Sequence, residues 1–314
     1  MDHEYDDSII AGFSEEEKTI NRLIGFVYLI TSITSMIVQV IIFLAFLKNP
    51  QILKNTSYKI MLHIGCCNFV QQISFFLTSF SIIFIYYDSP LWIDSIGGAL
   101  CQATFLMTVF FIVLLTLNCF DIFYQQKFFP SINRNNFFMK GIIGCYIWGI
   151  LIFSLYMLPP FSMEFSHLEI GYNFKIQSAI YNYAWEFENK VVIGFLTFSF
   201  FIYIFIVVKI HRLKQHQNNS FRSTFSLRDI NFLLQAILNF IIYVFIELLW
   251  EFADDILPDN RYIFITINYF FALTFSSNTI LCVIIISEVK DMIKKMFCRL
   301  GKEKVSRVMN KINV

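Results

Sequence analysis

The chain has 314 residues, of which 57% are hydrophobic and only 15% are charged. A soluble domain carries about 25% charged residues, so this composition excludes an ordinary soluble protein and indicates an integral membrane protein. The net charge of +1 is uninformative, because the position of each charge along a membrane protein matters more than the sum.

Seven apolar segments are long enough to cross a bilayer, whose hydrocarbon core of about 30 Å takes roughly 20 helical residues. The sequence therefore predicts an all-α membrane protein, a bundle of seven transmembrane helices that forms one domain over residues 23–286. An acidic amino-terminal segment, 1–22, precedes the bundle, and a basic amphipathic tail, 287–314, follows it. We place the spans near 23–47, 60–87, 98–124, 141–160, 191–208, 230–250 and 262–286.

Basic residues alternate between the two sides of this predicted bundle. The amino-terminal segment and the second, fourth and sixth loops hold five Lys and Arg, whereas the first, third and fifth loops and the tail hold nineteen. Basic residues favour the cytoplasmic side, so we expect an extracellular amino terminus and a cytoplasmic carboxyl terminus in a multi-pass protein of the plasma membrane. Residues 1–22 lack the basic start and apolar core of a signal peptide, so the first span is expected to act as an uncleaved anchor.

The third span, which begins near Cys101, is expected to be the central helix of the bundle. Helical spacing puts Thr104, Thr108 and Asn118 on one face, with Asp121 one turn further on. This face is more polar than its neighbours. In a membrane bundle the more polar face turns towards the other helices and away from lipid.

The loop at 161–190 is long, acidic and aromatic, which is typical of a segment at the membrane surface. In the tail, the apolar residues Val289, Ile293 and Met296 alternate with lysines at a spacing that suits a helix lying on the inner leaflet. Cys298 in this segment is either a candidate palmitoylation site or an unmodified thiol.

Four short motifs resemble one receptor family. Residues 58–61 read YKIM, 64–68 read IGCCN, 97–101 read GGALC and 115–119 read LTLNC. Together with seven spans and an outside amino terminus, they resemble the nematode serpentine chemoreceptors of the class T and class X type. The resemblance implies a bundle of the G-protein-coupled receptor type, an environmental small molecule or a peptide as ligand, and a heterotrimeric G protein as partner.

The chain departs from the pattern of this family in several places. Cys119 stands where a basic residue usually follows the asparagine at Asn118, so the charge lock on the inner side is expected to be missing. Asn68 replaces the acid of the second span, and Cys101 has no cysteine in the following outer loop to bond with. The resemblance places Asn118, Cys119 and Asp121 on the G-protein side.

The resemblance also implies a ligand site between the outer halves of the helices. Thr104 and Thr108 are candidate contacts on the third span, and Glu247 and Trp250 are candidates near the outer end of the sixth. Glu247 either contacts a polar or cationic ligand or belongs to an acidic cluster at the water boundary. Asp121, near the inner end of its span, is either a G-protein contact or a solvated residue at a helix end.

Three amides lie towards the cytoplasmic halves of the first, second and seventh spans: Gln39, Asn68 and Asn278. They form either a buried polar cluster that rearranges on activation or ordinary hydrogen bonds that hold the helices together. The sequence leaves both readings open.

The residues and the resemblance together predict a chemosensory receptor whose basic inner loop, 209–228, and basic tail face the anionic leaflet and the G protein. The expected partners are the ligand, the G protein and membrane lipids. The alternative is a small transporter or channel, a class that tends to show paired repeats and interrupted spans. We expect no enzyme activity, cofactor, metal or nucleic-acid partner, because no nucleophile–base pair, metal-type Cys/His spacing or phosphate loop occurs.

Overall fold

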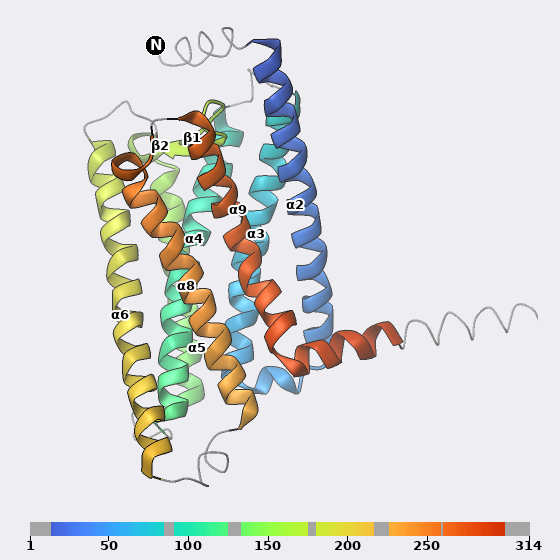
Figure 1. Ribbon diagram of the computed structural model, residues 1–314, viewed down its shortest axis with the longest axis vertical. Coiled ribbons are helices and arrows are strands. Elements are labelled where there is room, and N and C mark those ends of the chain that lie inside the picture. The colour runs from blue at the N-terminus through green and yellow to red at the C-terminus, as the bar shows by residue number, and fades with distance from the viewer. Residues whose placement is uncertain are drawn as a thin grey trace, which may run out of the picture.

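The computed structural model describes residues 14–84, 91–124, 133–174, 180–216, 226–258 and 260–298. Within them, seven helices are long and apolar enough to cross a membrane, and they pack side by side as one elongated bundle (Figure 1). The predicted fold class is therefore confirmed. Residues 1–13 of the amino-terminal segment, 85–87 of the second span, 217–225 of the basic loop and 299–314 of the tail lie outside the described residues.

The seven helices follow one another along the chain, and the longest connection between them joins α5 to α6. Their bounds are α2 Glu15–Lys48, α3 Thr56–Phe84, α4 Leu91–Phe123, α5 Arg134–Tyr156, α6 Ile180–His216, α8 Leu227–Ile256 and α9 Arg261–Ile285. Two short 3-10 turns, η1 Ile52–Lys54 and η2 Pro159–Phe161, and two strands, β1 Met163–Ser166 and β2 Gly171–Phe174, lie in the connections.

Polar side chains define where several of these helices begin. Ser14 caps α2 and Ser226 caps α8, each in a capping box whose third helical residue, Glu17 or Asp229, bonds back to the cap. Asn260 caps α9 by accepting from the backbone N–H of Tyr262. Such caps satisfy backbone donors that the first turn of a helix leaves without partners.

Four helices, α2, α4, α5 and α6, begin well before the spans that hydropathy predicts, and α2 and α6 show the largest differences. The first helix starts at Glu15, whereas its apolar segment starts near residue 23. The fifth helix starts at Ile180, whereas its apolar segment starts near residue 191. The extra turns carry charged residues, which average hydropathy excludes from a span although a helix can continue into water. As a result Glu188, assigned to a loop by the sequence analysis, lies within α6 and is buried.

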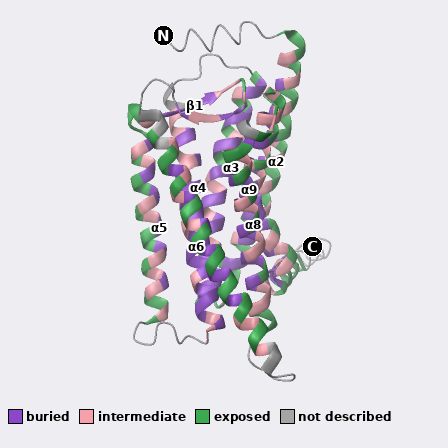
Figure 2. Cartoon of the chain, turned by 60° about the vertical axis from the view of Figure 1, so that its left-hand side comes forward, coloured by how far each residue is buried: buried purple, intermediate pink, exposed green. Residues whose placement is uncertain are grey.

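The helix α4 is the central element, as expected for the third span. In its most apolar window 72% of the residues are buried, against 28% in α2 and in α5. Figure 2 shows buried residues along the middle of the bundle and many exposed ones on the outer helices. Large apolar side chains such as Leu23, Ile30 and Phe201 are exposed on the outer faces, which is the pattern of helices surrounded by lipid.

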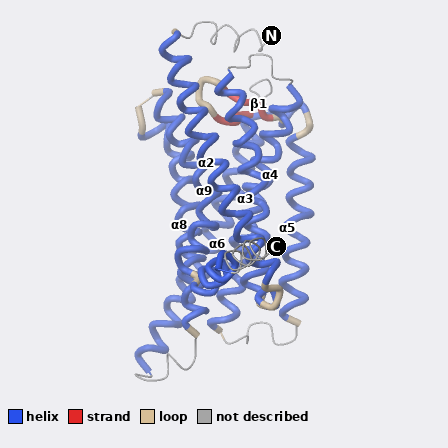
Figure 3. Tube along the Cα trace, turned by 90° about the vertical axis from the view of Figure 1, so that its right-hand side faces the viewer, coloured by secondary structure: helices blue, strands red, loops and turns tan. Residues whose placement is uncertain are grey.

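The connection between α5 and α6, which the sequence predicts to be extracellular, forms a β-hairpin. Strands β1 and β2 are antiparallel, with Met163 opposite Phe174 and Ser166 opposite Gly171. Figure 3 shows the hairpin lying between the ends of the helices, at the same end of the bundle as the first turns of α2. Ile170, at the turn, has a left-handed backbone with φ of 53°, which is unusual for a β-branched residue. Its side chain is almost fully buried, and this burial offsets the strain.

Hydrogen bonds hold the hairpin on the bundle. The Tyr172 hydroxyl lies 2.6 Å from the Thr78 hydroxyl on α3. On α9, Asn268 Nδ2 donates to the Glu169 carbonyl at 2.9 Å, and Arg261 Nε donates to the Leu168 carbonyl at 2.6 Å. All seven cysteines are free, so the attachment of the hairpin is entirely noncovalent.

A further helix, residues 287–298, turns away from α9 and runs across the cytoplasmic end that the sequence predicts (Figure 1). Val289 and Met296, expected to lie on the inner leaflet, are instead buried, and Val289 packs in a cluster with Ile42 and Phe46 of α2. The protein itself covers this apolar face, because the inner ends of α2 and α9 leave apolar side chains beside it. Cys298 is exposed at the end of this helix.

A methyl group added at Gly98 is predicted to destabilise the protein. A Cβ there would lie 2.7 Å from Met163 Cβ and 2.9 Å from Tyr172 Cδ1, so Gly98→Ala must push the hairpin away from α4. Overpacking of this kind costs about 1–3 kcal/mol. The midpoint of thermal unfolding in detergent should fall by several degrees. Gly144→Ala is the matched control, because a Cβ at that glycine of α5 meets nothing within 4 Å. A Gly98→Ala protein as stable as the control would show that the hairpin does not rest on α4.

Candidate functional site

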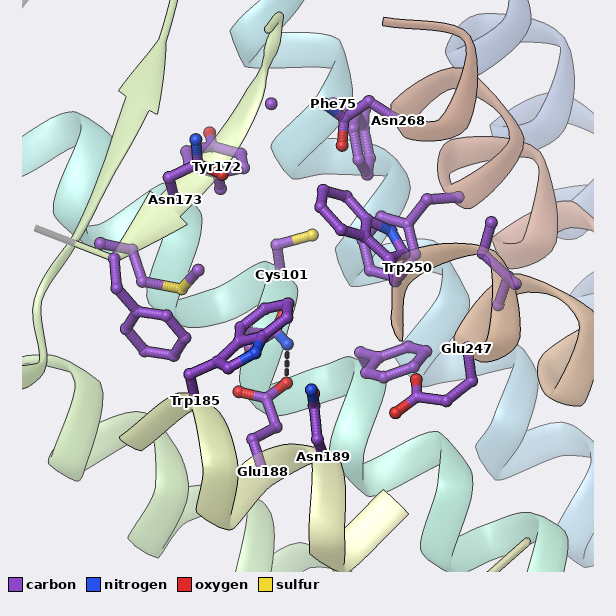
Figure 4. Close-up of a pocket in the computed structure, with 17 residues that line it drawn as sticks. Phe75, Cys101, Tyr172, Asn173, Trp185, Glu188, Asn189, Glu247, Trp250 and Asn268 are labelled. Atoms are coloured by element: carbon purple, nitrogen blue, oxygen red, sulfur yellow. Dashed lines mark hydrogen bonds between the residues drawn. The ribbon is translucent and has the colours of Figure 1, made fainter. Parts of the chain in front are cut away.

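A small cavity of about 60 Å³ lies beneath the hairpin, between the halves of the helices nearest to it. Its walls come from α4, α6, α8 and α9, with one residue from α3, and β2 closes it from outside (Figure 4). Residues distant in the sequence therefore meet here only because the bundle and the hairpin fold together.

Aromatic rings form much of the wall of this cavity. Trp185 of α6 and Trp250 of α8 meet edge to face, with ring centroids 6.3 Å apart. Phe105 of α4 and Phe271 of α9 also line it, with their ring centroids 5.1 Å apart. Aromatic faces carry partial negative charge and attract cations.

Glu188 is a buried acid on α6 that accepts a hydrogen bond from each of two other side chains. The Tyr156 hydroxyl of α5 donates to Glu188 Oε2 at 2.6 Å. Gln102 Nε2 of α4 donates to the other carboxylate oxygen, Oε1, as the dashed line in Figure 4 marks. Both donors are uncharged, so they satisfy the oxygens of Glu188 without neutralising a negative charge.

Glu247 is a second buried acid, on α8, and it differs from Glu188 in its partners. Its side chain is only 8% exposed, and none of the described residues forms a hydrogen bond or salt bridge with it. In Figure 4 its carboxylate lies on the side of α8 that faces Asn189 and Glu188. An ionisable group without a partner inside a membrane bundle is costly and by default marks function.

The lining of the cavity contains acidic side chains and, among the described residues, no basic ones. Glu188 and Glu247 both line it, and among the described residues no Lys, Arg or His does. A positively charged group between the two helices would be attracted by both carboxylates, in surroundings where little water screens them. The arrangement of two acids and several aromatic rings is therefore suited to a small cation.

The structure brings two of the four sequence-predicted ligand residues to the cavity. Glu247 and Trp250 line it, whereas Thr104 and Thr108 do not. The Thr104 hydroxyl donates to the Leu100 carbonyl at 2.6 Å, and the Thr108 hydroxyl donates to the Thr104 carbonyl at 2.8 Å. Such bonds to the preceding turn occupy the hydroxyl of a helical threonine.

Sequence reasoning missed the contribution of α6. Trp185, Glu188 and Asn189 line the cavity, but they lie in a stretch that hydropathy assigns to a loop. Their spacing of three and four residues is helical. A search for helical periodicity of aromatic and polar residues outside the apolar spans could have found them.

The three amides, which the sequence places either in one polar cluster or in ordinary hydrogen bonds between helices, do not share a hydrogen-bond partner. The Thr279 hydroxyl of α9 donates to Gln39 Oε1, and Gly65 of α3 lies against the Gln39 amide. Asn278 Oδ1 instead accepts from Gln235 Nε2 of α8 at 2.7 Å. Asn68 is 1% exposed, and neither of its side-chain amide atoms has a hydrogen-bond partner among the described residues. Gln39 thus links the first, second and seventh helices, while Asn278 links the seventh to the sixth.

At the end of α4 away from the hairpin, a basic residue of α5 pairs with the acid near Cys119. Asp121 Oδ2 lies 2.7 Å from Arg134 Nε at the start of α5. The N–H is not aligned for a hydrogen bond, so this contact is ionic. Arg134 Nη2 also donates to Asn118 Oδ1 at 2.8 Å, and Asn118 Nδ2 donates to Ser57 Oγ of α3 at 2.7 Å. Asp121 is therefore a buried, paired acid and not a solvated residue at a helix end.

Comparisons with known proteins identify the fold. No family model and no curated protein sequence matches the chain. Among solved structures, squid rhodopsin matches with a TM-score of 0.71 and 12% sequence identity, over 90% of this chain and 87% of that one. At this identity the likeness concerns the fold alone, and the chain has the seven-helix fold of rhodopsin.

Replacing Glu188 tests whether its two donors need an acceptor. Glu188→Leu leaves the Tyr156 hydroxyl and the Gln102 amide without one, at a cost of about 1–3 kcal/mol for each buried donor. Glu188→Gln keeps an oxygen for Tyr156, and the Gln102 amide can rotate to present its own oxygen. The leucine variant should therefore unfold at a clearly lower temperature in detergent than the glutamine variant. Equal melting temperatures would mean that the two hydrogen bonds contribute nothing to stability.

Proposed function

We propose that the chain is a G-protein-coupled chemosensory receptor of the plasma membrane whose ligand is a small cationic molecule. The observation that carries the ligand class is Glu247, a buried acid that faces a cavity lined with aromatic rings and has no partner of its own. The rhodopsin fold and the family motifs in the sequence support the receptor class. The position of the cavity under the outer hairpin supports a ligand that arrives from outside.

The ligand would act by favouring one arrangement of the helices over another. A cation held between Glu188 of α6 and Glu247 of α8 attracts both helices, and Trp185 and Trp250 would close on it from the same two helices. Because a ligand shifts an equilibrium only through its difference in affinity for the two states, this contraction at the outer end must alter the inner end of α8. The resulting inner cleft would receive the G protein.

The inner end offers a fixed element against which α8 can move. Arg134 joins the inner ends of α4 and α5, and Asn118 extends this link to α3. By contrast α8 is held to α9 through uncharged contacts, including Gln235 to Asn278. Uncharged hydrogen bonds are weaker than charge-assisted ones, so α8 is the helix that separates more readily. The proposed G-protein side therefore includes Asn118, Cys119 and Asp121, with Arg134 added by the structure.

The exposed inner helix 287–298 supports two smaller proposals. Its lysines, Lys290, Lys294 and Lys295, would face the anionic lipids of the inner leaflet. Cys298 is exposed at the end of this helix, where an attached acyl chain would enter that leaflet. This arrangement corresponds to an extracellular amino terminus and a cytoplasmic tail.

The ligand class is tested by neutralising Glu247. In cells that express the chain, a panel of small amines is screened for a G-protein-dependent second messenger, with membrane current recorded beside it. Glu247→Gln should raise the half-maximal concentration of an active amine about 10- to 100-fold, because a hydrogen bond to a charged group contributes about 1.5–3 kcal/mol. Glu186→Gln is the matched control, since Glu186 is exposed on α6 and pairs with Lys190.

Two results would contradict the proposal. An unchanged amine response in Glu247→Gln, at equal surface expression, would remove the carboxylate from the ligand site. A current that persists when the G protein is removed would favour the transporter or channel alternative.

A further inference from the structure

A groove of about 350 Å³ lies between α6 and α8 on the side of the bundle away from its centre. Its rim consists of side chains that are exposed in the protein alone and would face lipid in a bilayer: Ile193, Phe200, Ile241 and Leu248. The buried side chains of Leu196 and Phe240 form its floor. The groove is therefore apolar and open towards the acyl chains of the membrane.

Glu247 lines this groove as well as the cavity beneath the hairpin. It is the only charged residue among the described side chains that line the groove, and the rest of the lining is apolar except for Thr197. Among the described lining residues, Glu247 is the one that the groove and the cavity share, and α6 packs mainly on α4 and makes few contacts with α8. The carboxylate of Glu247, which has no partner among the described residues, therefore lies between α6 and α8 where the groove opens towards lipid.

The size of the two spaces indicates where a larger ligand could lie. Pockets that hold small molecules measure about 300–1,000 Å³. The groove falls within this range, at about 350 Å³, whereas the cavity beneath the hairpin, at about 60 Å³, does not. A molecule with more than a few heavy atoms would therefore find most of the space beside Glu247 on the lipid side.

The chemistry of the groove specifies its occupant. Apolar side chains on the floor and rim match an alkyl chain, and a single acid at one end matches one cationic head. A carboxylate beside lipid lacks the water that would otherwise stabilise it, so a cationic head has a strong advantage over a neutral head of the same size. An ordinary phospholipid places its charged group at the membrane surface, away from a carboxylate buried between helices.

We propose that this groove is a binding site for a membrane-dissolved single-chain amine, with its ammonium group on Glu247 and its chain between α6 and α8. The site goes beyond the proposed function, since it concerns a second surface of the protein and requires no G protein. Because both sites use Glu247, an amine in the groove would compete with a cation in the cavity beneath the hairpin.

The test is photo-crosslinking of the full chain in phosphatidylcholine nanodiscs. The probe is a dodecylamine that carries a diazirine on its chain, and the matched probe is the corresponding alcohol. Labelled peptides are located by mass spectrometry. We expect the amine to label α6 and α8 around the groove about tenfold more than the alcohol does, and unlabelled dodecylamine to abolish this difference.

Three variants separate the groove from general lipid exposure. Glu247→Gln should reduce amine labelling to the level of the alcohol. Thr197→Trp fills the groove and should reduce labelling by both probes there. Thr266→Trp is the matched control, because Thr266 is exposed on α9 and lines neither the groove nor the cavity. Should Thr197→Trp fail to fold, Ile241→Trp fills the groove from the opposite helix.

Amine labelling spread evenly over the lipid-facing helices would overturn the proposal, and so would equal labelling by amine and alcohol. The nanodiscs contain no G protein, so failure of the receptor proposal leaves this experiment unaffected. Conversely, signalling by a water-soluble amine through the cavity beneath the hairpin can be observed while dodecylamine does not label the groove. This pair of results would support the receptor proposal and contradict the groove site.

Discussion

Inside a bilayer a polar or charged side chain must find its partner within the protein, because lipid offers none. Several hydrogen bonds and one buried ion pair between helices follow from this constraint. Asp121 meets Arg134, Glu188 accepts from Tyr156, and Gln39 accepts from Thr279. Each contact joins two different helices, so the requirement to satisfy polar groups also determines which helices lie beside one another.

Several buried polar side chains among the described residues lack a hydrogen-bond partner, Tyr28, Trp148 and Ser199 among them, and Glu247 and Asn68 are the two that bear on the proposed function. Glu247 has no hydrogen-bond or ionic partner among the described residues, yet it faces both the cavity beneath the hairpin and the lipid-facing groove. Asn68 lies deeper in the bundle with its amide unpaired. Natural proteins keep such local conflicts mainly where function requires them. In the receptor that we propose, Glu247 receives the ligand, and Asn68 remains a candidate for the rearrangement that follows.

Hydropathy predicted the seven-helix fold well because each span must carry enough apolar residues to cross the membrane. Glu247 was a candidate because it is an acid inside an apolar span, and Trp250 because it lies beside Glu247 near the end of that span; both line the cavity. Hydropathy missed Glu188, because the turns of α6 that precede its apolar segment are rich in charge and look like a loop. The hairpin escaped prediction for a related reason: its strands have four residues each and are fixed by contacts with α3, α4 and α9. The partner of Asp121 lies across a loop, and residue spacing within one helix does not reveal it.

The central claim is that this protein transmits ligand binding to a G protein. The most direct test uses the purified full chain in nanodiscs with a panel of purified heterotrimeric G proteins, and it measures the rate of guanine-nucleotide exchange as amines are added. Our account predicts that an active amine accelerates exchange on at least one heterotrimer, and that Glu247→Gln weakens this effect. Solute or ion flux through the chain in liposomes, with no acceleration of exchange on any heterotrimer, would contradict it.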